Sequence, residues 1–222
     1  MRMRSILAGA AAPILLAGAL LAGSAQAQKP PPSPKDYPEV ADTSFTEANG
    51  NHVLQLALVI PAPRKAVWDR FATAEGYKAW ATPMAKIDFG VGGLIEASYD
   101  AKARVGDADN IRNRIIAYSP ERMVVLKNEN APAALPGREK FGEIVTIIEL
   151  ADAGEGQTRV SITGVGYKPG EPYDTLLRHF GWGNAYSLMM LKTSFVKGPI
   201  DWKAMEARQQ AQAAAARVQG TK

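Results

Sequence analysis

The segment 171–196 constrains the fold most, because it is the longest stretch of the chain with the pattern of a single helix. Pro172 suits the first helical turn, where a missing N–H donor costs nothing, and Gly198-Pro199 ends the run. Apolar side chains recur along it at spacings of three and four, so they share one face. These residues are Tyr173, Leu177, Phe180, Leu188, Leu191 and Phe195. Such a face requires a larger element to pack against.

The first half of this face differs from the second half. Asn184 interrupts the apolar line and Gly181 supplies no side chain, whereas Leu188, Leu191 and Phe195 are typical core residues. We therefore expect the helix to be tightly packed near its C-terminal end, with space beneath its first half. That space is the candidate functional site.

The chain before this helix alternates with a period of two over six stretches that turn residues separate. The predicted strands are 84–89, 94–99, 110–119, 122–130, 141–151 and 158–166. A further strand, 52–60, precedes them and follows Asn49-Gly50, a strong hairpin dipeptide. Two short helices, 64–73 and 74–80, come directly after that first strand.

This order of elements allows few arrangements in which the long helix is buried. The most economical is a strongly curved antiparallel sheet wrapped around the helix, with the two short helices closing one end. The predicted class is therefore α+β: a helix-grip fold with about seven antiparallel strands around a long C-terminal helix.

Five sequence landmarks occur in the same order along the domain: VIPAPRKAVWDRFATAEGYKAW, DFGVGG, AYSPERMVVL, QTRVSITGVG and HFGWGNAYSLMMLK, the last followed by KGPIDW. Together they resemble the SRPBCC superfamily, which includes START proteins and the birch pollen allergen. The likeness is greatest to the branch named after the activator of heat-shock-protein-90 ATPase, and it runs from about His52 to Pro199. Members of the superfamily include lipid carriers, polyketide cyclases and co-chaperones, so the resemblance specifies the fold better than the function.

The resemblance also implies a deep cavity between the sheet and the terminal helix. If the register follows the family, three residues of the strand 94–99 face the cavity and the other three face outward. The inward set is Ile95, Ala97 and Tyr99, and the outward set is Leu94, Glu96 and Ser98.

The N-terminal segment indicates export. Residues 1–27 read as a signal peptide, with Arg2 and Arg4 before an apolar run and Ala25-Gln26-Ala27 at the cleavage site. The alternative is an uncleaved membrane anchor. We expect a Pro-rich linker at 28–42, the domain at 43–200 and an Ala- and Gln-rich flexible tail at 201–222. The expected location is periplasmic or secreted, with no stable membrane insertion after cleavage; the sequence indicates no oligomeric state.

Composition excludes several kinds of site. The chain has no cysteine, which excludes disulfides, thiolate nucleophiles and sulfur-ligated metals. Without Arg2 and Arg4, 24 of the 26 basic residues remain against 22 acidic ones, and no basic cluster indicates nucleic-acid binding. His52 and His179 have no metal-ligand spacing around them. We expect no metal and no cofactor.

Four residues are candidates for the wall of the cavity. The aromatic rings of Trp80, Tyr99 and Phe180 can face a ligand or can simply fill the core. Asn184 is more informative, because a polar side chain on an apolar helix face needs a hydrogen-bond partner or water. Its alternative partner is the neighbouring backbone.

Charged strand residues supply two further candidates. If Arg114 points inward, it can bind a ligand carboxylate, with Glu143 as its counterion in the empty state. The alternative for Arg112, Arg114 and Glu143 is a solvated outer face. Alternation cannot decide between them, because Ile115 and Ile116 are both apolar.

Three functions are consistent with this sequence. The preferred one is an exported, non-catalytic protein that binds a small hydrophobic or lipid-like ligand in the cavity. The second is a cyclase-like or hydrolase-like enzyme that uses Arg114, Glu143 or Tyr99 in the same cavity. The third is an interaction module that acts through an exposed apolar patch. The Pro- and Ala-rich stretch 128–140 is predicted to be a loop and a candidate lid.

Overall fold

The structure, a computed structural model, describes residues 33–219. The predicted signal peptide and the first residues of the predicted linker lie outside the described residues. Nine antiparallel strands form one sheet in the order β1-β3-β9-β8-β7-β6-β5-β4, with β2 also paired to β3. The strands are β1 Ala41–Asp42, β2 Phe45–Thr46, β3 His52–Ile60, β4 Met84–Ile87, β5 Leu94–Ser98, β6 Ile111–Ser119, β7 Met123–Asn130, β8 Val145–Asp152 and β9 Thr158–Tyr167.

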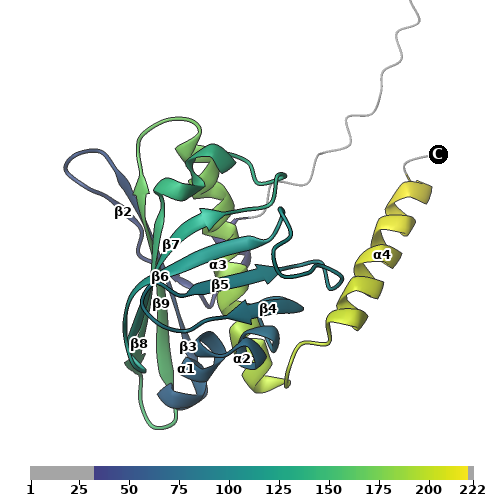
Figure 1. The fold of residues 1–222 in the computed structure, drawn as a ribbon, viewed down its shortest axis with the longest axis horizontal. Coiled ribbons are helices and arrows are strands. Elements are labelled where there is room, and N and C mark those ends of the chain that lie inside the picture. The colour runs from purple at the N-terminus through teal and green to yellow at the C-terminus, as the bar shows by residue number, and fades with distance from the viewer. Residues whose placement is uncertain (1–32, 220–222) are drawn as a thin grey trace, which may run out of the picture. The chain divides into compact units, whose positions relative to one another are not determined.

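The sheet curves around the long helix, and two short helices close one end (Figure 1). The helices are α1 Arg64–Ala72, α2 Ala74–Lys78, α3 Tyr173–Val196 and α4 Trp202–Gln219, with 3₁₀ turns η1 Pro34–Asp36 and η2 Arg138–Glu143. The predicted helix-grip fold is confirmed, and the seven expected strands correspond to β3–β9. Within the described part of the chain, no helix combines the length and the hydropathy that crossing a bilayer requires.

Helix α3 buries a line of residues that differs from the predicted one in its first half. Tyr173 and Leu188 are buried, as expected, but between them the buried residues are Leu176, Gly181 and Ala185. The small residues Gly181 and Ala185 let the helix backbone come close to its neighbours. The prediction of open space at Gly181 is therefore wrong. A Cβ at Gly181 would lie 3.4 Å from the ring of Pro34.

The segment predicted as the end of the linker is part of the domain. Its turn η1 packs on α3, and β1 pairs with β3 in the register Ala41↔Ala57. Val40 is buried in the hydrophobic core, and Glu39 forms an ion pair with Lys192 of α3. The described domain thus includes residues 33–42, because they pack on α3 and extend the sheet beside β3.

The predicted flexible tail begins as an attached helix. Asp201 caps α4 by accepting a hydrogen bond from the Ala204 N–H at 3.0 Å. The indole of Trp202 donates to the Lys78 carbonyl at 2.6 Å, and the Ile200 N–H donates to the Ala79 carbonyl at 2.9 Å. The first turn of α4 is therefore fixed to α2 and is not a free end.

The exposed fractions of two residues in and after strand β5 do not follow simply from the predicted faces. Ile95 and Ala97 are buried as expected, whereas Tyr99, just after the strand, is 64% exposed. Glu96 is predicted to face outward, yet it is only 5% exposed. The loop after β5 covers it, and one of its oxygens accepts hydrogen bonds from the Asn110 side chain and the Gly106 N–H, both at 2.7 Å.

Candidate functional site

A cavity of about 810 Å³ lies between the sheet and α3. Its lining includes residues of α2, of strands β5–β9, of the loop 131–135, of one side of α3 and of the start of α4. Most of the lining side chains are aliphatic or aromatic. This volume is in the range of pockets that bind small organic ligands. The predicted hollow between the sheet and the helix is therefore present.

Trp80 belongs to the buried core, the half-buried Phe180 packs against that core, and both rings form part of the cavity wall. Trp80 is 5% exposed, donates its indole N–H to the Arg70 carbonyl at 3.0 Å and packs edge-on against Phe71. Phe180 stacks on Phe141 with 5.8 Å between ring centroids. Both Trp80 and Phe180 line the cavity. The two alternatives that the sequence left open for these aromatics are thus compatible, since one ring face can pack on protein while another borders the cavity.

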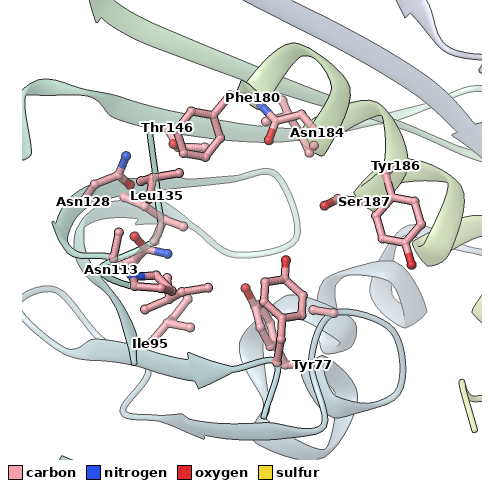
Figure 2. Close-up of a pocket in the computed structure, with 18 of the residues that line it drawn as sticks. Tyr77, Ile95, Asn113, Asn128, Leu135, Thr146, Phe180, Asn184, Tyr186 and Ser187 are labelled. Carbon is pink, nitrogen blue, oxygen red and sulfur yellow. The ribbon is translucent and has the colours of Figure 1, made fainter. Parts of the chain in front are cut away.

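Asn184 and Tyr99 also line the cavity. Figure 2 shows Asn184 beside Phe180 on α3, facing the hollow. Gly183, one residue earlier, lines the same space, and a Cβ placed there would meet no atom within 4 Å. The gap that was expected at Gly181 is therefore found at Gly183, on the other side of the helix.

Arg114 lies on the outer face of the sheet and does not line the cavity. Its guanidinium donates to the Glu129 carboxylate, with one contact of 2.8 Å, and to the Gly92 carbonyl at 2.6 Å. Arg112 shares this face and contacts Glu96 at 3.3 Å. The prediction that Arg114 faces a ligand is therefore wrong, and the alternative of an outer face is correct for both arginines.

Glu143 is also separate from the cavity. It ends the turn η2 instead of lying in a strand, and its carboxylate accepts hydrogen bonds from Lys140, Lys168 and the Tyr173 hydroxyl. The two lysines and the tyrosine lower the pKa of Glu143 to about 2, with the Lys168 contact as the largest cause. The predicted pairing of Glu143 with Arg114 does not occur, because β7 supplies Glu129 to that arginine.

Two β-bulges explain why alternation could not assign the faces. Between Arg112 and Asn113 the register of β6 against β7 shifts, leaving Glu129 as the extra residue of β7. Between Ile115 and Ala117 it shifts again, and Ile116 is the extra residue of β6. Ile115 is fully buried and Ile116 is 43% exposed.

The sequence reasoning missed several polar residues that line the cavity. They are Tyr77, Asn113, Asn128, Thr146 and Ser187. Figure 2 shows Asn113 and Asn128 on one wall, Thr146 near Phe180, and Tyr77 on another wall. The sequence did contain one indication that Asn113 faces the cavity, because it lies between Arg112 and Arg114. Side chains alternate along a strand, so if both arginines are on the outer face of the sheet, Asn113 is on the inner face.

The cavity carries little charge. Among the residues that the structure describes, no lysine or arginine lines it, and Asp100, His179 and Glu206 are exposed lining residues. Partial desolvation at the cavity lowers the pKa of His179, and burial raises the pKa of Tyr77, so the uncharged form of both groups is favoured. No group of three or more potential metal ligands occurs within residues 33–219.

The comparisons with known proteins agree with this architecture. The family model described as Activator of Hsp90 ATPase homolog 1-like protein matches residues 61–193. No significant match was found among curated proteins.

Solved structures share the fold at low sequence identity. The solution structure of an Aha1 dimer from Colwellia psychrerythraea is 18% identical with a TM-score of 0.51, and the match covers 66% of this chain and 97% of that one. CalU16 from Micromonospora echinospora is 18% identical with a TM-score of 0.50, covering 80% and 96%. A conserved protein of unknown function from Enterococcus faecalis is 15% identical with a TM-score of 0.50, covering 78% and 91%. At these identities the likeness concerns the fold alone.

Proposed function

The chain belongs to the family of Activator of Hsp90 ATPase homolog 1-like proteins, as its sequence landmarks implied, and from this membership and the cavity we propose that it binds a small hydrophobic molecule. The single observation that carries the proposal is the cavity of about 810 Å³ with its largely aliphatic and aromatic lining. Binding of an apolar ligand in an apolar cavity of this size is favourable, because apolar surface of both the ligand and the cavity wall is removed from water.

We further propose that the protein is exported and binds its ligand outside the cytoplasm. The N-terminal sequence supports this part of the proposal, with its basic start, apolar run and Ala25-Gln26-Ala27 site. Intact-mass measurement of the protein from the envelope fraction tests it. A chain beginning at Gln28 is the expected result, whereas an intact chain beginning at Met1 in the cytosol would contradict export.

Binding can be tested with Nile red, an uncharged dye whose fluorescence rises in apolar surroundings. We expect a saturable increase in emission with the wild-type protein and at least a roughly tenfold weaker affinity for Gly183→Phe, because the phenyl ring would occupy the cavity. Gly90→Phe is the matched control, since Gly90 also has open space around it but does not line the cavity.

Two results would contradict the proposed function. One is wild-type protein that binds neither Nile red nor other uncharged apolar probes. The other is equal affinity of the wild type and Gly183→Phe. Native mass spectrometry of protein purified from its own envelope adds an independent measurement, in which a bound molecule of defined mass is the expected result.

The enzymatic alternative loses two of its three proposed groups. Arg114 and Glu143 both bind protein partners away from the cavity, and of the three residues only Tyr99 lines it. No specific contact favours the interaction-module alternative over ligand binding, since the indole of Trp202 is engaged by the Lys78 carbonyl.

A further inference from the structure

Two asparagines inside the cavity differ from two neighbouring asparagines outside it. Asn113 of β6 and Asn128 of β7 are cross-strand partners and both line the cavity. Asn110 and Asn130 belong to the same two strand ends, but their amides donate to protein acceptors. The Asn110 side chain donates to the Glu96 carboxylate at 2.7 Å. The Asn130 side chain donates to the Asn110 backbone carbonyl at 2.5 Å.

The inner pair differs. The Asn113 Oδ1 is shielded from solvent and accepts no hydrogen bond from any residue of the described chain. Asn128 is only 5% exposed and borders the same cavity, directly opposite Asn113 on the neighbouring strand. Buried polar groups are normally hydrogen-bonded, so the unpartnered Oδ1 of Asn113 indicates a missing binding partner in the cavity.

The position of the pair restricts what that partner is. Figure 2 shows both carboxamides facing the hollow, with apolar Ile95 and Leu135 close by. No lysine or arginine of the described residues lines the cavity, so a buried carboxylate or phosphate would lose its hydration without gaining a counterion. A carboxamide offers both N–H donors and a carbonyl acceptor. The complementary group is uncharged and has both functions as well.

We propose that Asn113 and Asn128 form the polar anchor of the cavity and select a neutral, mainly apolar ligand that carries one amide-like group. This inference rests on the proposed function, because it concerns the ligand of the same cavity. The apolar body of the ligand fills the space beside Phe180 and Trp80, and its amide exchanges hydrogen bonds with the two asparagines.

A matched series of probes tests the proposal. Naphthalene-2-carboxamide, naphthalene-2-carboxylate and 2-methylnaphthalene share one ring system and differ in the polar group, and each can be measured by competition with Nile red. We expect the carboxamide to bind roughly tenfold tighter than 2-methylnaphthalene, and the carboxylate to bind more weakly than both. In the double variant Asn113→Leu, Asn128→Leu, the preference for the carboxamide should disappear while 2-methylnaphthalene still binds.

Asn51→Leu is the control, because Asn51 lies in the turn before β3 and does not line the cavity. Its probe preferences should equal those of the wild type. Binding of 2-methylnaphthalene without any preference for the carboxamide, or a preference that survives in the double variant, would overturn this inference and leave the proposed function intact. Failure of all three probes and of Nile red would instead remove the proposed function and this inference with it.

Thermal unfolding without ligand provides a second measurement that needs no probe. Leucine has the same branched arrangement of four side-chain heavy atoms as asparagine, and its larger methyl groups would point into the open cavity. Asn113→Leu therefore removes an unpartnered amide and should melt at the same temperature as the wild type or higher. Asn110→Leu should melt lower, because it removes one of the donors to the buried carboxylate of Glu96. An equal loss of melting temperature in both variants would show that the inner asparagines hold the fold, and would overturn the assignment.

Discussion

Gly181 of α3 lies directly against Pro34 of η1, with 3.4 Å between the proline Cγ and the place that a Cβ of Gly181 would occupy. This contact brings the segment before β1 under the long helix. It limits the size of the side chain that this position can take, in the middle of a helix where glycine is normally unfavourable by about 1 kcal/mol relative to alanine.

Substitutions of Gly181 should depend sharply on size. Gly181→Ala keeps an ordinary van der Waals contact and should change the free energy of unfolding by no more than about 1 kcal/mol, in the stabilising direction. Gly181→Leu should cost about 1–3 kcal/mol, because the larger side chain collides with Pro34. Urea unfolding measures both. Gly183→Leu is the control, since it faces open space, and equal losses for the two leucine variants would contradict the contact with Pro34.

The buried carboxylate of Glu96 should make stability depend on pH. Burial tends to raise the pKa of Glu96, but hydrogen bonds from Asn110 and Gly106 and the charge of Arg112 outweigh it and hold the pKa below its ordinary value of 4.5. The ionised form is therefore favoured in the folded state. Its contribution to stability is present above pH 4.5 and is lost as the pH falls through the lowered pKa.

Glu96→Gln should thus cost about 1 kcal/mol at pH 7, because bonds to a charged acceptor become bonds to a neutral one. The cost should shrink when the pH falls below 4.5. Urea unfolding at several pH values measures the difference, with the exposed Glu149→Gln as control. A cost that is independent of pH would show that the charge of Glu96 does not contribute.

The carboxyl group of Glu143 should titrate far below an ordinary glutamate. Its pKa of about 2 follows first from Lys168, then from the Tyr173 hydroxyl and then from Lys140. Carbon-detected NMR titration should give this value for the wild type and a higher value, shifted toward 4.5, for Lys168→Met. A Glu143 pKa near 4.5 in the wild type would contradict the cluster that joins η2 to the start of α3.

The first turn of α4 should slow ligand exchange. Trp202 and Met205 line the cavity, and Trp202 is bonded to the Lys78 carbonyl at 2.6 Å. Loss of one hydrogen bond of about 1 kcal/mol in Trp202→Ala should make Nile red dissociate roughly 3–10 times faster in stopped-flow dilution. Deletion of residues 210–222 keeps Trp202 and Met205 and should leave the rate unchanged. Equal rates for Trp202→Ala and the wild type would contradict this role.

Periodicity predicted the regular elements well because each follows a local pattern. The first long strand, His52–Ile60, has the predicted bounds, and α3 begins within two residues of the prediction. Strand β8 begins at Val145 and not at Phe141, because residues 138–143 form the turn η2. The residues of this turn show no periodicity that distinguishes them from a strand. The alternating pattern of β8 was therefore extended too far toward the N-terminus.

The lining of the cavity was only partly predictable. Trp80, Phe180, Asn184 and Tyr99 were found because aromatic or polar residues stand out in helices and at strand ends. Asn113 and Asn128 were missed because the side that they face depends on the bulges in β6 and β7. A bulge shifts all later residues of a strand relative to its partner strand. The amino-acid composition of one strand does not reveal where such a bulge lies.

The sequence alone determined the class of fold, the order of elements and the family, because each rests on local periodicity, turn residues and short motifs. Tertiary structure alone decided which polar groups have partners. Arg114 and Glu143 have theirs outside the cavity, whereas the Oδ1 of Asn113 has none among the described residues. The reason is that these hydrogen bonds join residues that are distant in sequence. Which residues meet depends on the register of the strands and on how closely α3 packs on the sheet, and both depend on the whole packed domain.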